Sequence, residues 1–467
     1  MKNILKLFAL FWIFSMNAQN KEILYGLEEV PQSMLLNPGA RIDYKKHIGI
    51  PFLSQIHVNG GSSGVSVYDI FQDSNTNIND RIRNKIFELK NSDFFTATQQ
   101  LDVLNFGWKS SKNYYFSGGI YQELDFVLYF PKDLAILAWD GNANHLNKEF
   151  DLGEISTAGD LSMVYHFGVN KKITNSLTLG LRAKLYSSMI SYRSTGNTGT
   201  FVTRLSESGN NIYEHIITNA NLSVNTSGIA SLRDLEGTSQ VTNEILGRAF
   251  FGGNFGLGID LGGTYEITEK WTASASVLDV GAVFNSKDVE SYNVDGDYTL
   301  DGIELIFPED NSPPYYDDLI DELEDVFAVD TTYSSYSQMR PIKVYASVKY
   351  NFGKEIGGSG ACNCLKMGEK QEYNQAVGFQ YYSVFRPLGP QMAATLFYYR
   401  RFSDYLSVKA TYTADSYSYS NIGLGLVANF NKVNFYITAD NLLWYENLAK
   451  AKSVSLQFGF NLIFAEE

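Results

Sequence analysis

Three groups of residues in this sequence have types and spacings that could support chemistry. Residues 60–64 read Gly-Gly-Ser-Ser-Gly and fit the G-x-S-x-G pattern, which presents a nucleophilic serine in many hydrolases. Cys362 and Cys364 are one residue apart and could bind a metal ion or form a strained disulfide. The candidate general bases and metal ligands are the histidines His47, His57, His145, His166 and His215.

None of the three groups has the surroundings that its chemistry requires. The nucleophile pattern needs a buried parallel sheet, whereas residues 60–64 are expected to form a Gly/Ser-rich loop. No histidine lies near the two cysteines in the sequence, and the five histidines are scattered along it. We therefore predict no catalytic residue, no cofactor and no metal site, and we expect that the protein is not an enzyme.

The elements that must position these residues are β-strands, and the end of the chain shows their pattern most clearly. Strict alternation predicts a strand with one apolar and one polar face. The residues of one parity are Val454, Leu456, Phe458, Phe460, Leu462 and Phe464, and those of the other are Ser453, Ser455, Gln457, Gly459 and Asn461. A soluble protein would cover the apolar face with a second layer, whereas in a membrane barrel lipid covers it.

The same alternation recurs along the chain and predicts an all-β fold, a transmembrane antiparallel up-and-down β-barrel of about 14 strands. The predicted strands are 47–58, 99–110, 114–127, 157–168, 176–194, 249–265, 271–285, 342–352, 374–385, 392–402, 405–414, 421–430, 432–440 and 453–464. Their polar faces carry Arg182, Lys184, Lys343, Lys349 and Lys409. Charges on the face away from lipid predict a wet lumen.

The connections between these strands divide by parity. Those after even-numbered strands are short, such as 111–113, 169–175, 266–270, 403–404 and 431, with the exception of 353–373. Those after odd-numbered strands include the long stretches 59–98, 128–156, 195–248 and 286–341. Short turns at one end and long loops at the other are typical of outer-membrane barrels, so the long loops are predicted to be extracellular.

The N-terminus predicts export. Lys2 and Lys6 precede an apolar run from Leu7 to Phe14, and Ala18 follows, which is the layout of a signal peptide (1–18) cleaved before Gln19. Residues 19–46 are then expected to form an N-terminal periplasmic or lumenal segment, and 47–467 the barrel. The predicted location is the outer membrane, with its lipid as a partner.

Charge narrows the remaining partners. The formal net charge of −14 argues against nucleic acid as a partner, and two cysteines are too few for a disulfide framework.

Residues 77–90 and 313–327 carry apolar residues at helical spacing and predict amphipathic helices. The second lies in 308–330, which holds nine acidic residues and no Lys or Arg. A solvated helix is favoured there over a calcium site, because no calcium-loop spacing is present.

Two short motifs belong to such a barrel. The ending resembles the C-terminal insertion signal of outer-membrane proteins, for which Gln457, Gly459, Leu462 and Phe464 are the matching residues. In the N-terminal segment, Pro38 pushes Asn37 out of the helical region and Gly39 can take positive φ. Asn37-Pro38-Gly39 is thus either a turn that leads into the first strand or part of a hatch inside the lumen.

Longer stretches resemble a family of Bacteroidota outer-membrane barrels that carries a domain of unknown function. They are LEEVPQSMLLNPGA, GLGIDLGGTYEITEKWTASASVLDVGAVF and VNFYITADNLLWYENLAKAKSVSLQFGFNLIF. That family is distantly similar to the long-chain fatty acid transporter superfamily, in which an Asn-Pro-Ala element lies in an N-terminal segment folded into the barrel. Here Asn37-Pro38-Gly39 departs from that element at Gly39.

Two functions are consistent with these features. The resemblance implies a channel or transporter for hydrophobic or amphipathic small molecules, with such a molecule as a partner. The alternative is a structural barrel, or one associated with type IX secretion, whose long loops engage a secretion or surface protein. The sequence itself identifies no cargo.

Overall fold

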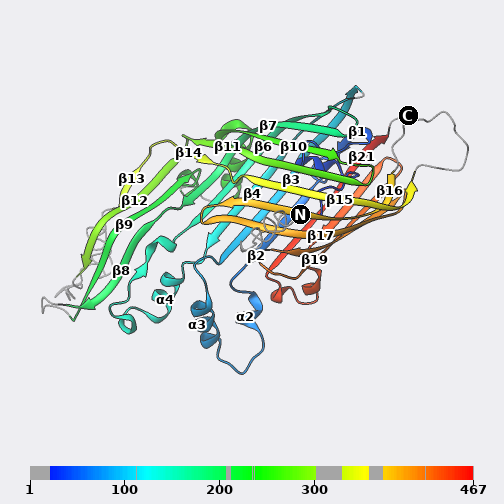
Figure 1. Cartoon of the computed structure of the whole chain (residues 1–467). Coiled ribbons are helices and arrows are strands. Elements are labelled where there is room, and N and C mark those ends of the chain that lie inside the picture. The colour runs from blue at the N-terminus through cyan, green and yellow to red at the C-terminus, as the bar shows by residue number, and fades with distance from the viewer. Residues whose placement is uncertain are drawn as a thin grey trace, which may run out of the picture.

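The structure is a computed structural model that describes residues 21–465, except 112, 207–211, 234, 236, 301–328, 357–371 and 416. Its main feature is a closed antiparallel barrel of 14 strand positions (Figure 1), as predicted. The strands are β1 (Tyr44–Gly49) together with β2 (Ile56–Ser62), β3 (Phe94–Ser111), β4 (Tyr114–Tyr129), β6 (Thr157–Lys172), β7 (Leu177–Ser194), β10 (Asn254–Glu266), β11 (Trp271–Asn285), β15 (Lys343–Ile356), β16 (Glu372–Arg386), β17 (Gly389–Ser403), β18 (Leu406–Ala414), β19 (Asn421–Phe430), β20 (Val433–Ala439) and β21 (Ser453–Ala465). The predicted signal peptide (1–18), Cys362, Cys364 and the predicted helix 313–327 lie outside the described residues.

The barrel closes where the first strand pairs with the last. Both β1 and β2 pair with β3 on one side and with β21 on the other, for example His47 with Ile463 and His57 with Gln457. In β21, Leu456 is 40% exposed whereas Gln457 is 1% exposed. The alternation in the sequence therefore separates an outer apolar face from an inner polar one.

The predicted continuous strand 47–58 is wrong in one respect, because residues 50–55 interrupt it. β1 begins at Tyr44 and ends at Gly49, and β2 resumes at Ile56. Pro51 has no N–H for a ladder, and Phe52 takes a φ of 62°, which turns the chain out of the sheet. The interruption places Ser54 and Gln55 in the buried interior.

The two ends of the barrel differ in their connections, and the long connections contain more structure than expected. At one end β19 and β20 are joined by two residues, of which Asn431 has the positive φ that a tight hairpin requires. At the other end, the predicted loops 195–248 and 286–341 contain strands that extend the wall beyond the barrel (Figure 1). They are β8 (Thr198–Leu205), β9 (Tyr213–Ser227), β12 (Val289–Leu300), β13 (Asp330–Thr332) and β14 (Tyr336–Met339), with β5 (Phe150–Asp151) beside β8.

Short helices complete the long-loop end. The predicted helix at 77–90 is confirmed as α3 (Ile78–Glu88), which begins where the Asn77 side chain accepts a hydrogen bond from Asn79 N. The other helices and helical turns of these connections, among the described residues, are α2 (Val67–Phe71), α4 (Lys132–Asp140), η3 (Ala143–His145), η4 (Leu152–Glu154), α5 (Ala230–Arg233), α6 (Thr238–Gly247), η5 (Arg248–Gly252), η6 (Leu442–Trp444) and η7 (Leu448–Lys450). A further turn, η2 (Pro31–Leu35), belongs to the N-terminal segment. None of the helices among the described residues is long and apolar enough to cross a bilayer.

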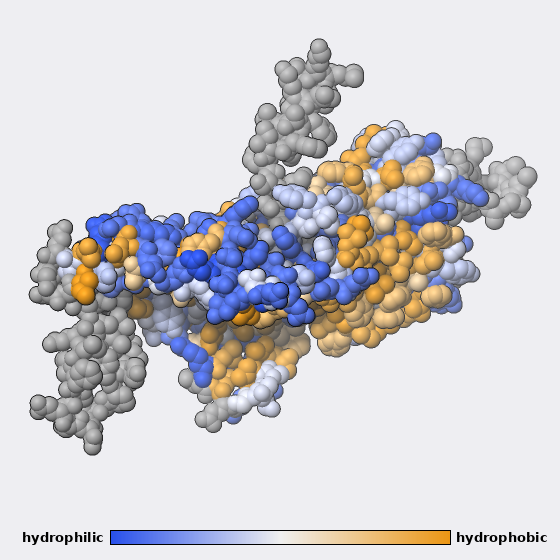
Figure 2. Space-filling model, turned by 90° about the horizontal axis from the view of Figure 1, so that it is seen from below, coloured by the Kyte–Doolittle hydropathy of each residue, from blue (hydrophilic) through white to orange (hydrophobic). Residues whose placement is uncertain are grey.

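The outer wall of the barrel is apolar. On β7 and β10, alternate residues such as Leu181 and Leu261 are each 50% exposed. Figure 2 shows apolar side chains gathered over the barrel part of the molecule, whereas the opposite part of this face is mostly hydrophilic. We call this outer surface the apolar belt.

Candidate functional site

The N-terminal residues 21–43 lie inside the barrel and form the candidate site together with the wall around them. Their backbone hydrogen bonds close turns within the segment, such as those from Leu36 N to Ser33 O and from Ala40 N to Asn37 O. Side chains attach the segment to opposite parts of the wall, since Gln32 bonds Asn461 of β21 and Asn37 bonds Gly263 O of β10. The segment therefore occupies the lumen without joining the strand ladder.

The first half of the segment packs on an apolar part of the wall. Ile23, Leu24 and Leu27 are each 1% exposed or less, and the Tyr25 ring stacks on Tyr345 with centroids 5.0 Å apart. The wall contributes Leu278 of β11 to this cluster, together with six residues that we call the tyrosine sector: Tyr345, Tyr382, Val384, Ala393, Val427 and Tyr436. They come from β15–β17, β19 and β20, whose lumen-facing positions a water-filled pore would line with polar groups.

The Lys409 side chain holds the first half of the segment by hydrogen bonds to backbone carbonyls of that segment. Its Nζ donates to Tyr25 O at 2.7 Å and to Glu22 O at 3.3 Å, and also to Gln380 Oε1 at 3.2 Å. The side chain is 2% exposed. Lys409 faces the lumen, as predicted, but it is buried against the segment and not surrounded by free water.

The second half of the segment faces charged residues. Arg182 of β7 donates through Nη1 to Leu35 O at 3.1 Å and through Nη2 to Met34 O. The same guanidinium bonds Asp260 Oδ2 of β10 at 2.9 Å. Arg182 is 1% exposed and Asp260 is fully buried. A buried arginine thus holds two carbonyls of η2 while a carboxylate holds the arginine.

The ion pair of Arg182 and Asp260 is one end of a network. Lys184 contacts Asp260 at 3.0 Å and Asp279 at 2.6 Å. Lys343 contacts Asp279 and Glu123, both at 2.9 Å. Further along, Arg340 bonds Glu123 at 2.8 Å and lies 3.8 Å from Asp160. We call the eight residues the charged sector: Glu123, Asp160, Arg182, Lys184, Asp260, Asp279, Arg340 and Lys343.

Ion pairs between its members offset the cost of burying the charged sector inside the barrel. Each of its residues is at most 8% exposed, and unpaired charges at that burial would be strongly unfavourable. The sequence predicts a wet lumen at Arg182, Lys184 and Lys343. The structure corrects this prediction, because these cations are neutralised by carboxylates of neighbouring strands.

The Asn37-Pro38-Gly39 turn rests on a part of the wall that has no side chains. Gly180 of β7 and Gly262 of β10 are directly paired across the two strands. A Cβ at Gly180 would lie 2.0 Å from Pro38 O, and a Cβ at Gly262 would lie 2.2 Å from Asn37 Oδ1. The turn therefore approaches the wall at backbone distance, which only glycine permits.

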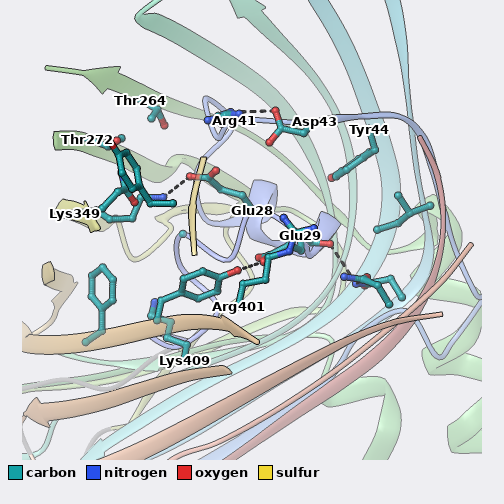
Figure 3. A pocket seen from close by; sticks show the side chains of 18 of the residues that line it. Glu28, Glu29, Arg41, Asp43, Tyr44, Thr264, Thr272, Lys349, Arg401 and Lys409 are labelled. Atoms are coloured by element: carbon teal, nitrogen blue, oxygen red, sulfur yellow. Dashed lines mark hydrogen bonds and ion pairs between the residues drawn. The ribbon is translucent and has the colours of Figure 1, made fainter. Parts of the chain in front are cut away.

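Below the segment, a pocket of about 450 Å³ opens at the short-turn end. Acidic residues of the segment face basic residues of the wall, as in the 2.8 Å pair of Glu28 and Lys349 (Figure 3). Glu29 accepts a hydrogen bond from Tyr399, and Arg41 pairs with Asp43 at 3.0 Å. The side chains of Lys349 and Glu28 are 22% and 26% exposed, so this pair is wetter than the charged sector.

A sequence profile of a family of unknown function, DUF5723, matches residues 38–440. The chain belongs to DUF5723. The match takes in most of the barrel and begins at Pro38, so it includes part of the turn that rests on Gly180 and Gly262. No curated protein matches the chain.

Solved structures that resemble this DUF5723 chain are barrels. The toluene transporter TbuX of Ralstonia pickettii is 10% identical, with 96% of this chain and 97% of that chain covered and a TM-score of 0.42. A FadL homologue of Pseudomonas aeruginosa is 10% identical over 97% and 100%, at 0.41. The toluene transporter TodX of Pseudomonas putida is 9% identical over 97% and 98%, at 0.40. Similarity at this level identifies no cargo for this chain.

The residues of the predicted insertion signal divide between the two faces of β21. Gln457 points inward and bonds the Tyr436 hydroxyl at 3.3 Å, and Gly459 faces the Ser54 carbonyl, where a Cβ would lie only 2.0 Å away. Leu462 and Phe464 share the outward parity and pair with Ile48 and Lys46 of β1. A role in insertion stays a prediction.

The residues first considered for chemistry do not converge. Ser62 ends β2, and its hydroxyl accepts a hydrogen bond from Val65 N at 3.3 Å. His47 bonds Tyr115 and Asn105 inside the barrel, whereas His215 bonds Asn142 at the long-loop end. The described part of the chain holds no cluster of three or more His, Cys, Asp or Glu residues suited to a metal ion.

Sequence reasoning missed the acidic half of the charged sector. Glu123, Asp160 and Asp260 each lie within a predicted strand at a lumen-facing position. A buried carboxylate at such a position is unfavourable unless a cation pairs with it. The inward parity of these residues was therefore a signal, present in the sequence, that they form ion pairs. Which cation reaches which carboxylate depends on the register between strands.

Proposed function

We propose that this protein is an outer-membrane channel for hydrophobic or amphipathic small molecules and that residues 21–43 form its hatch. The single observation that carries the proposal is that the lumen is filled by a segment outside the strand ladder. Side chains such as Arg182 and Lys409 hold it by its carbonyls. Water or cargo can replace those hydrogen bonds while the barrel stays closed, whereas removal of a strand would open the barrel.

The lining supports the cargo class. Withdrawal of the hatch would uncover the tyrosine sector on one side of the lumen and leave the charged sector on another. Tyrosines give an apolar surface with polar tips, which suits molecules that combine apolar and polar parts. A channel that conducts only ions or sugars is lined by polar residues, whereas Val384 and Val427 are apolar residues at lumen-facing positions here.

The remaining parts of the proposal follow from the belt and the N-terminus. A closed barrel with an apolar outer face suits a bilayer, and the predicted signal peptide suits export to the outer membrane. Membrane lipid and a hydrophobic small molecule are the proposed partners, and no enzyme activity is proposed.

The test is solute efflux from proteoliposomes that contain either the full chain or a variant lacking residues 21–42. β1 begins at Tyr44, so the deletion leaves every strand and its pairing in place. We expect a large rise in efflux at equal insertion, because a barrel of more than eight strands cannot fill its lumen with wall side chains alone. A heat-modifiable band on gels serves as the control for folding. Unchanged low efflux from a folded deletion variant would contradict the hatch.

Cargo class is tested separately by the lipids that copurify with the variant lacking residues 21–42, in which the tyrosine sector is uncovered. We expect mass spectrometry of this extracted variant to detect a bound amphipathic molecule, and we expect the added substitution Val384→Asp to remove it. A deletion variant that carries no such molecule, and that passes sugars as fast as amphipathic dyes, would favour a general pore.

A second function is supported by the strands beyond the barrel. β8, β9 and β12 pair into a sheet that continues the wall at the long-loop end (Figure 1). Such a sheet could engage a secretion or surface protein, as in a structural or type IX secretion-associated barrel. Crosslinking of a protein to this sheet in cells, together with no efflux from the deletion variant, would move the conclusion to that function.

A further inference from the structure

One segment of the long connections lies against the outside of the barrel and not over its mouth. In the pairing of β6 with β7, Tyr165 lies opposite Leu185, which is 38% exposed on the outer face. Met163 has the same parity, yet it is only 8% exposed because Ala249 and Ile245 cover it. α6 and η5 therefore cover outward-facing side chains of the wall.

Arg248 fastens this segment to the barrel. Its Nη1 donates to Met189 O at 3.0 Å and to Gly228 O at 2.5 Å. Met189 lies at a bulge where β6 and β7 shift register, so the arginine bonds a carbonyl at an interruption of the ladder. Ser187 Oγ donates back to Arg248 O at 2.7 Å. The polar groups of η5 are thus directed toward the protein.

The opposite side of the segment is apolar and open. Leu246, Phe250 and Phe251 are 52%, 65% and 56% exposed. Phe251 stacks on Tyr165 with centroids 4.4 Å apart and has a φ of 65°. Exposure of two neighbouring phenylalanines to water is unfavourable, and the left-handed backbone of Phe251 adds a conformational cost. Their arrangement therefore indicates an apolar partner.

The position of these residues identifies that partner. β10 begins two residues after η5 ends, and its outward residues Phe255 and Leu257 are 47% and 49% exposed in the apolar belt. The Phe250–Phe251 pair is therefore continuous with the surface that faces lipid, at the edge nearest the long loops.

We propose that η5 is immersed among the acyl chains of the membrane leaflet on the long-loop side. Phe250, Phe251 and Leu246 would extend the lipid contact of the barrel outward from its wall. Phe and Leu side chains are favoured where headgroups meet acyl chains, and burial there removes the apolar surface that water would otherwise contact. The inference concerns the membrane and does not depend on whether the lumen conducts.

The test places the photo-crosslinking residue p-benzoylphenylalanine at position 250 in the full chain, inserted in vesicles of phosphatidylethanolamine and phosphatidylglycerol. The same residue at Tyr265, 49% exposed on β10, is the control for belt contact. Placed at Tyr333, 73% exposed after β13, it is the control for a residue outside the membrane. We expect lipid adducts at 250 in a yield close to that at 265 and several-fold above that at 333. A yield at 250 no higher than at 333 would overturn the proposal.

A second variant separates membrane contact from internal packing. Phe251→Gly keeps the left-handed backbone without strain but removes the aromatic side chain. We expect its thermal midpoint in detergent to be unchanged or higher, while the adduct yield at 250 falls several-fold in vesicles. A lower midpoint in detergent with an unchanged adduct yield would mean that the aromatic pair serves only to pack the barrel.

Discussion

The tyrosine sector and the charged sector hold the same segment by different physics. Against the tyrosine sector, Ile23, Leu24 and Leu27 are held by burial, which is non-directional and tolerates small shifts. Against the charged sector, η2 is held by a guanidinium whose orientation Asp260 fixes, which is directional and fails when one partner moves. The first half is therefore held mainly by burial, to which the Lys409 hydrogen bonds add, whereas the second half depends on one buried ion pair.

The largest effect is expected at Arg182. Arg182→Ala removes both carbonyl contacts and one cation from Asp260, and breaking a buried pair costs on the order of 3 kcal/mol. We expect hydrogen exchange of residues 31–40 to accelerate and efflux to rise. Arg182→Lys is the matched control, because it retains the charge but cannot hold two carbonyls and a carboxylate together. Equal exchange in both variants and the unchanged chain would show that the charged sector does not hold the hatch.

A cavity in the tyrosine sector is expected to have a somewhat smaller effect. Leu24 is fully buried, and Leu24→Ala should reduce the local stability of the hatch by about 2 kcal/mol or more. Hydrogen exchange should accelerate in residues 21–30 more than in 31–40, since the two halves rest on different sectors. Uniform acceleration over both halves would mean that the hatch opens as a single unit.

The glycine contact tests the turn at Asn37-Pro38-Gly39, where the second half of the segment meets the wall. Gly180→Ala would place a Cβ 2.0 Å from Pro38 O, so the turn must move, at about 1–3 kcal/mol for overpacking. Gly60→Ala in β2 is the matched control, because its Cβ would meet only Thr96 O at 3.9 Å. Efflux should rise in the first variant alone. Equal efflux from the two variants would remove the turn from any gating role.

The smallest effect is expected at the wet end of the hatch. Glu28→Gln breaks the partly exposed pair with Lys349, and such pairs contribute less than about 1 kcal/mol. The efflux of this variant should differ from that of the full chain only at low ionic strength, where screening is weak. A rise as large as that of Arg182→Ala would place the main latch at the short-turn mouth.

Much of the barrel could be predicted because an apolar outer face and a polar inner face require the same alternation of every strand. Residues 453–462 alternate without exception, and their outward parity in the structure is the predicted one. The interruption after Gly49 was open to prediction, since Pro51 lies within the predicted strand. β8 and β9 were not predicted, because strands beyond the barrel are not required to alternate apolar and polar residues.

The site was less predictable than the wall. Arg182 and Lys409 were recognised as lumen-facing, but their partners are backbone carbonyls, which have no signature in a sequence. Glu123 and Lys343 are 220 positions apart, and only the closed register brings them together. The Asn37-Pro38-Gly39 motif marked a turn, whereas its contact with Gly180 depends on which strand passes beside it.

The interrupted first strand has a consequence for assembly. β1 and β2 pair with β21 across more than 390 residues of chain, so closure of the barrel depends on the least local strand pairings among the described residues. Non-local pairings form slowly because loop-closure entropy opposes them until many contacts are made together. Here the pairing of the first strand with β21 is also interrupted at Pro51, so it must form as two short ladders, one with β1 and one with β2. We expect this pairing to form last, with residues 21–43 already between the two edges, and an assembling chain to be open on this side longer than on any other.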